Sequence, residues 1–215
     1  MSTQITHHPD PTTLVSYVAG TLPEPLAAVV ASHVSLCADC RREIRALEAL
    51  GGALLMDAPA IPGPILLAPA PRGGELLKAP VIPRARDERL PLPIAATYGL
   101  SFASIPWRWL GPGVWHYRLP LSEGVNGDLR LLKISAGRAM PDHGHGGSEL
   151  TLVLDGAYAD ATGTYGVGDM QDVDEAVEHT PIADPVTGCI CLIASEKPAR
   201  FKGWVGRLLQ PFTGM

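Results

Sequence analysis

GRAMPDHGHGGSELTLVLDG, residues 137–156, decides the fold of the second half of this chain. Its polar residues follow the spacing His143-x-His145-x3-Glu149 between two flanking glycines. Residues two apart in a strand point to the same face, so His143 and His145 can both point into a β-barrel. Glu149, on the next turn or strand, can reach the same point. Two imidazoles and a carboxylate are common metal ligands, so the stretch predicts a metal site inside a β-structure.

Short runs of strand-forming residues surround this stretch and are separated by glycines. Many short strands without intervening helices predict an all-β barrel or a double-sheet jelly roll. The runs lie at 113–119, 129–134, 149–154, 170–173 and 189–194.

The spacing from Gly137 to Gly156 reproduces the first motif of the cupin family, which this part of the chain resembles. A fourth metal ligand is expected from a later strand. His179 fits that position, because it follows Gly168 and Asp169, which resemble the turn that opens the second cupin motif. Three imidazoles and a carboxylate suit zinc, but also iron, manganese, nickel or copper.

The first part of the chain has helical spacing instead. Its apolar residues predict three short helices, over 12–18, 26–33 and about 39–54. Thr21 and Glu24 fit a capping box at the start of the second helix. Three short helices alone make a thin core.

Proline changes the composition abruptly between these two parts. Residues 58–93 hold many prolines and no sustained period, which predicts a linker with short helical or docking segments. The expected organisation is therefore a helical domain at 1–57, the linker at 58–93 and a β-domain at 94–215, an α plus all-β chain of two domains.

A second set of metal ligands lies in the helical part. His33-x3-Cys37-x2-Cys40 spans the end of the second helix and the start of the third, and a short turn there would bring the three together. Zinc needs a fourth ligand, for which His8 is the first candidate and His7 its neighbouring rival. The alternative is a pair of small buried cysteines near a surface histidine. A structural zinc contributes on the order of 10 kcal/mol of folding free energy, which a thin core needs.

These patterns together resemble the zinc-binding anti-sigma factors of the ChrR type. The likeness is carried by HHPDPTTLVSYVAGTLPE at 7–24, HVSLCADCR at 33–41, PDHGHGGSELTLVLDGAY at 141–158, EHTPIA at 178–183 and CICLIA at 189–194. It implies one zinc in each domain and a helical domain that wraps between the core-binding regions of an extracytoplasmic-function sigma factor, which excludes RNA polymerase. It also implies that the cupin domain responds to singlet oxygen or organic peroxides. The implied partner surface lies on apolar helix faces, for whose residues core packing is the alternative: Leu14, Val18, Val29, Leu47 and Leu50.

Charge and hydropathy limit the partners and the cellular compartment that we expect for this chain. The net charge of -5 disfavours direct binding to nucleic acid. No apolar run approaches the roughly 20 residues that span a bilayer, and residues 1–11 are polar, so we expect a cytoplasmic protein with no membrane partner. In that reducing compartment, cysteines are expected to bind metal or act in redox chemistry. Cys189 and Cys191, two apart in an apolar run, are either buried strand residues or a redox pair.

Two other function classes compete with the regulatory one. A metal-dependent cupin enzyme, such as a dioxygenase or isomerase, is the first, because this ligand set leaves coordination positions open. The sequence shows no further acid, base or substrate clamp, so we expect no enzyme. The second is a zinc-dependent module for a partner other than a sigma factor.

Overall fold

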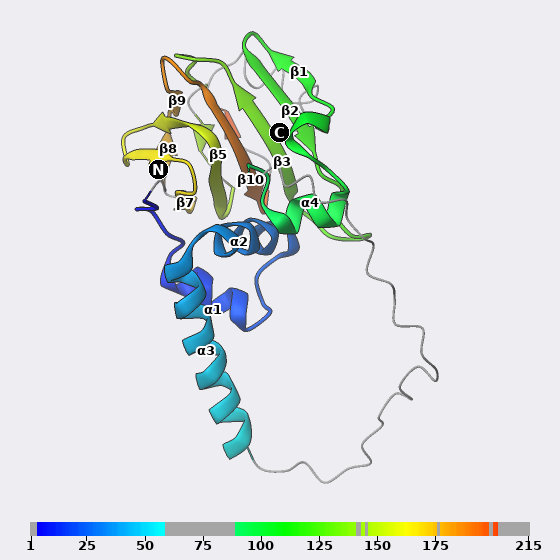
Figure 1. Cartoon of the computed structure of the whole chain (residues 1–215), viewed down its shortest axis with the longest axis vertical. Coiled ribbons are helices and arrows are strands. Elements are labelled where there is room, and N and C mark those ends of the chain that lie inside the picture. Colours follow the sequence, from blue (N-terminus) through cyan, green and yellow to red (C-terminus); the bar gives the residue numbers. More distant parts are fainter. Residues whose placement is uncertain are drawn as a thin grey trace.

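The computed structural model describes residues 4–58, 89–140, 143–144, 146–175, 177–197 and 200–201. The first part of the chain forms three helices and the second part a β-structure, and Figure 1 shows the second helix lying against this β-structure while the third extends away from it. The expected linker at 58–93 falls outside the described residues except at its two ends.

The helical part matches the sequence prediction. The three predicted helices are confirmed as α1 (Pro11–Val18), α2 (Glu24–Leu36) and α3 (Ala38–Asp57). Asp10 caps α1, since its carboxylate accepts a hydrogen bond from the Thr12 amide at 2.8 Å. None of the helices in the described part of the chain combines the length and the apolar character that crossing a bilayer requires.

The capping box predicted from Thr21 and Glu24 is wrong. Pro23, at φ -53° and ψ 144°, is the extended residue that precedes α2, and no side chain caps this helix. The Thr21 hydroxyl donates instead to the Ser16 carbonyl at 3.2 Å. The Glu24 carboxylate accepts from the amide of Ser122 at 2.9 Å and so ties α2 to the β-structure.

The β-structure consists of two antiparallel sheets. The larger runs β1-β2-β3-β10-β5-β6, with β7 and β9 also paired to β5, and the smaller is β11-β4-β8. The described strands do not close into a ring, so the arrangement is a jelly-roll-like pair of sheets. All five predicted runs lie on strands. The strands are β1 (Arg108–Gly111), β2 (Val114–Arg118), β3 (Asp128–Ile134), β4 (His143–Gly144), β5 (Glu149–Ala159), β6 (Thr164–Gly166), β7 (Met170–Val173), β8 (Glu178–His179), β9 (Ile182–Ala183), β10 (Cys189–Ser195) and β11 (Arg200–Phe201).

A short helix, α4 (Leu92–Tyr98), and the 3-10 turn η1 (Phe102–Ser104) precede the first strand, where the sequence predicted no helix. Pro91 is the N-cap of α4, and a second proline lies in its first turn, where a missing N–H costs no helical hydrogen bond. Gly99, at φ 63°, ends the helix. The same prolines that predicted a linker therefore start a helix.

The helices complete one core with the outer face of the larger sheet. Leu26 and Val29 of α2 belong to the same buried cluster as Leu131 of β3, Leu152 of β5 and Leu192 of β10. Side chains alternate across a strand, so the other face of these strands builds a second cluster inside the jelly roll. This second cluster includes Val114, Leu132, Ile134, Val153, Cys189 and Cys191. The thin core of the helices is thus extended by the sheet on which α2 lies.

Candidate metal centres

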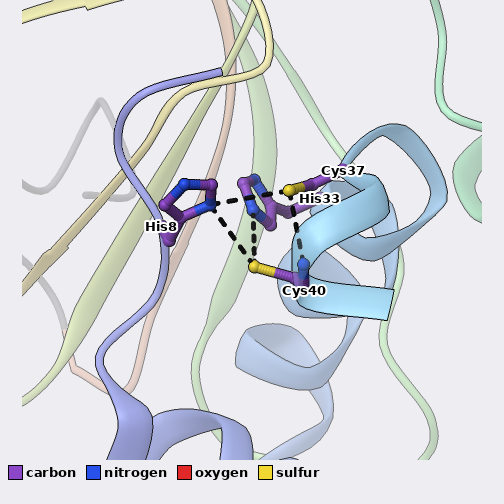
Figure 2. A group of neighbouring side chains, drawn as sticks. All are labelled: His8, His33, Cys37 and Cys40. Atoms are coloured by element: carbon purple, nitrogen blue, oxygen red, sulfur yellow. Dashed lines mark hydrogen bonds between the residues drawn. The ribbon is translucent and has the colours of Figure 1, made fainter. Parts of the chain in front are cut away.

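Four side chains converge where the helices meet the sheet, as Figure 2 shows. His8 comes from the arm before α1, His33 from the last turn of α2, and Cys37 and Cys40 from the start of α3. One ligand atom from each residue lies within 4.8 Å of the others.

The separations within this cluster fit a tetrahedral metal ion. The Nδ1 of His8 lies 3.5 Å from the Sγ of Cys37 and 3.4 Å from the Sγ of Cys40. The Nε2 of His33 lies 3.3 Å from the Sγ of Cys40. Zinc bonds of about 2.0 Å to nitrogen and about 2.3 Å to sulfur give tetrahedral edges of about 3.3 to 3.8 Å. The two imidazoles and two thiols therefore could hold zinc.

The helix junction explains the spacing of the two cysteines. Cys37, at φ -94° and ψ 115°, is both the C-cap of α2 and the N-cap of α3, so one extended residue turns the chain. Its Sγ accepts from the amide of Cys40 at 3.5 Å. Both sulfurs therefore lie at the amino end of α3, where the helix dipole favours negative charge and hence thiolates.

Burial sets the protonation of the cluster in the metal-free chain. It lowers the pKa of His33 to about 4, so this imidazole is neutral near pH 7. The Nδ1 of His33 lies 3.0 Å from the carbonyl oxygen of Gly168, which can only accept, so Nδ1 carries the proton and Nε2 is left for a metal. Burial, followed by the neighbouring Cys37, raises the pKa of Cys40 to about 12, so a metal that binds there displaces a proton.

His7, the rival fourth ligand, points elsewhere. Its ring packs against Tyr165 with 4.5 Å between ring centroids, and its Nδ1 lies 3.5 Å from an Asp169 oxygen. The structure therefore brings His8, and not His7, to the two cysteines.

The predicted cupin metal site is described only in part. His145 lies outside the described residues, and only the backbone of His143 is described. Pairing of β4 with β8 places His143 opposite His179, so two of the four predicted positions are cross-strand neighbours. Glu149 starts β5 and is buried, as is His179. Ligation of a metal by this set stays a prediction.

His179 has a carboxylate partner that the sequence analysis missed. Its Nδ1 lies 2.8 Å from an oxygen of Asp160, and both side chains are almost inaccessible to solvent. Gln171 donates to the same oxygen at 2.8 Å. Burial opposes the charge of Asp160, but hydrogen bonds from Thr162, Gln171 and His179 hold the pKa of this carboxyl below its usual value. A carboxylate on one imidazole nitrogen is a common way to orient a histidine that binds metal. In the structure the other oxygen of Asp160 accepts from the amide of Thr162 at 2.8 Å in a turn, and no motif in the sequence indicates the contact with His179.

Cys189 and Cys191 lie apart from the N-terminal cluster. Both are buried in the second core cluster. A hydrogen bond from Cys189, together with burial, raises the pKa of Cys191 well above its usual range, which keeps this thiol protonated at rest. Their redox role stays a prediction that requires the oxidant to enter the core.

Known proteins are similar to this chain in both of its halves. Residues 96–198 match the ChrR cupin-like domain family. Over 214 residues, 97% of this chain and 98% of the relative, the sequence is 42% identical to the anti-sigma-E factor ChrR of Cereibacter sphaeroides. A crystal structure of Rhodobacter sphaeroides SigE in complex with the anti-sigma ChrR is similar at a TM-score of 0.73 and 42% identity, with 89% of this chain and 99% of the matched chain covered. The chain therefore belongs to the family of ChrR anti-sigma factors.

Proposed function

We propose that this chain sequesters an extracytoplasmic-function sigma factor through its helical part, and that zinc in the N-terminal cluster shapes the binding surface. The cupin part then senses an oxidative signal, singlet oxygen or an organic peroxide, and promotes release. The observation that carries the proposal is 42% identity along 97% of the chain to an anti-sigma-E factor. The relative is a regulatory protein and not an enzyme, so this chain is not assigned a reaction.

The helix faces expected to meet the sigma factor divide into core and surface. Leu14 and Val29 are 1% and 0% exposed and belong to the core. Val18 and Leu47 are half-buried and pack against that core. Leu50 is 58% exposed and is available to a partner.

The second half of α3 offers the larger apolar surface. Leu54, Leu55 and Met56 are 65%, 74% and 85% exposed. Leu54 lies on the face of α3 that carries Leu50, and Leu55 and Met56 extend the apolar surface round the end of the helix. In Figure 1 this half of α3 extends away from the sheets. Contiguous exposed apolar side chains mark interaction sites in soluble proteins. We assign this apolar end of α3, residues 50–56, to sigma-factor binding.

Zinc would fix the direction of this surface. The cluster ties together the arm, the end of α2 and the start of α3, and the apolar end lies further along α3 itself. A bound structural zinc contributes on the order of 10 kcal/mol to folding. Without it, the junction between α2 and α3 loses its strongest tie, and the apolar end is no longer held in one orientation.

Co-elution with a sigma factor tests the proposal. Full-length protein mixed with its cognate extracytoplasmic-function sigma factor, sought among those of the same organism, should elute as a stable 1:1 complex in size-exclusion chromatography. Cys37→Ala, Cys40→Ala and His33→Ala should each abolish the complex, whereas the matched core variant Cys189→Ala should retain it. If no candidate sigma factor co-elutes with the wild-type chain, the proposal is wrong, and the alternative of a different protein partner gains support.

A further inference from the structure

We propose that the cupin part completes the N-terminal metal site, so that metal binding there and docking of the helices on the cupin part are coupled. The coupling element is the turn and strand start at 168–171, which contacts the cluster, the arm and the partner of His179. The inference rests on the N-terminal cluster being a metal site, as the proposed function requires. It goes further because it assigns the second layer of that site to the other half of the chain.

The first contact is made to a metal-ligand candidate directly. His33 is fully buried, and its Nδ1 donates to the carbonyl oxygen of Gly168, 135 residues along the chain, at 3.0 Å. This bond fixes the ring orientation and the tautomer that leaves Nε2 facing Cys40. Partners of this kind on metal-bound histidines raise metal affinity by about 10- to 100-fold. The helical part alone does not contain this acceptor.

The second contact holds the arm that carries His8. One oxygen of Asp169 accepts from the amide of Thr6 at 2.7 Å and from the amide of His7 at 2.9 Å. Its other oxygen accepts from the amide of Gly166 at 2.9 Å within the cupin part. In return, the amide of Met170 donates to the carbonyl of His7 at 3.1 Å. Immediately before His8, the backbone of the arm therefore both donates hydrogen bonds to the cupin part and accepts one from it.

The fit between arm and turn is close. Gly168 adopts φ +90°, and a Cβ at this position would lie 2.7 Å from the Cγ1 of Ile5. The Asp169 side chain is only 7% exposed, so its carboxylate depends on the arm amides in place of water. Undocking would expose the carboxylate to water and break both arm hydrogen bonds together, and for this reason the contact is expected to form as a unit.

The same segment reaches the predicted cupin site. Gln171, two residues after Asp169, donates to the Asp160 oxygen that also bonds the Nδ1 of His179. Four consecutive residues thus contact His33, the arm and the support of His179. If metal binding at either candidate site strengthens docking of the helices on the cupin part, docking strengthens metal binding there by the same factor, because the coupling is reciprocal.

Cobalt titration of the full-length chain tests this coupling. Co²⁺ bound by Cys37 and Cys40 gives a thiolate charge-transfer absorption, which reports the N-terminal site and is lost in Cys37→Ser/Cys40→Ser. We expect Asp169→Ala, which removes the acceptor of both arm amides, to weaken Co²⁺ binding at this site about 10-fold or more. The matched control is Asp184→Ala, because the Asp184 carboxylate also accepts two backbone amides in a turn, those of Val186 and Thr187, and belongs to a different turn from the one that binds the arm.

A second measurement needs no variant. Adding Zn²⁺ to the metal-free wild-type chain should slow hydrogen exchange at the Met170 amide at least several-fold, while the amide of Val186 is unchanged. If the wild-type chain shows no thiolate absorption with Co²⁺, the metal site and the proposed function fail together. If it shows the absorption, but Asp169→Ala binds Co²⁺ as tightly as wild type or Zn²⁺ leaves Met170 exchange unchanged, the coupling alone is refuted.

Discussion

Truncating the apolar end of α3 should weaken sigma-factor binding without unfolding the chain. Leu54 and Leu55 are 65% and 74% exposed, and full burial of a leucine side chain contributes about 2 kcal/mol. If the sigma factor covers the exposed parts, the double variant Leu54→Ala/Leu55→Ala loses about 3 kcal/mol, which is about 100-fold in Kd. Alanine favours helix, so α3 itself should persist.

Isothermal titration of the sigma factor into the full-length chain measures this loss. Arg45→Ala is the matched control, because Arg45 is exposed on α3 more than two turns before Leu54 and about 180° from it round the helix axis, and its Kd should stay within a factor of about three. Circular dichroism should show equal helix content in all three proteins. A double variant that binds as tightly as wild type would mean that the apolar end is not part of the interface.

Three further predictions concern acid, induction and packing. In chelator-treated protein, burial holds the pKa of His33 at about 4 against an ordinary value of 6.5, so the unfolded chain takes up the proton first. The free energy of unfolding should therefore fall by about 2 kcal/mol between pH 7 and pH 5. Urea unfolding of His33→Gln at the two pH values should not show this decrease. Glu149→Ala and His143→Ala should leave sigma inhibition intact and blunt induction by peroxide in a reporter strain; loss of inhibition would show that the two halves do not divide the work. Gly156→Ala should cost more than about 2 kcal/mol in urea unfolding, because Gly156 has φ 71° and a Cβ there would meet a backbone carbonyl, whereas Gly111→Ala, which faces open space, should be nearly neutral.

Local patterns were sufficient to predict the three N-terminal helices, five of the strands and the residues of the N-terminal cluster, but not α4 or the shortest strands. The spacing from His33 to Cys40 follows from a helix end and a helix start separated by one extended residue, which is a short-range geometry. His8 could be proposed because a tetrahedral site lacked one ligand. The choice over His7 needed the structure, because it depends on Tyr165 and Asp169, more than 150 residues away.

The contacts between the halves could not be predicted from the sequence. Glu24 fitted a capping motif, but its carboxylate instead reaches Ser122 in the other half of the chain. The carbonyl of Gly168 carries no side-chain signal, and the sequence analysis did not single out Asp160. Such contacts depend on the packing of α2 on the sheet, which the periodicity of neither element specifies.

Zinc content and sigma binding of one full-length sample, before and after chelation, test the central claim most directly. We predict zinc bound through Cys37 and Cys40 in the purified chain, loss of the sigma complex when that zinc is removed, and recovery when it is restored. A chain without zinc at this cluster that remains folded and captures the sigma factor with unchanged Kd would contradict the account.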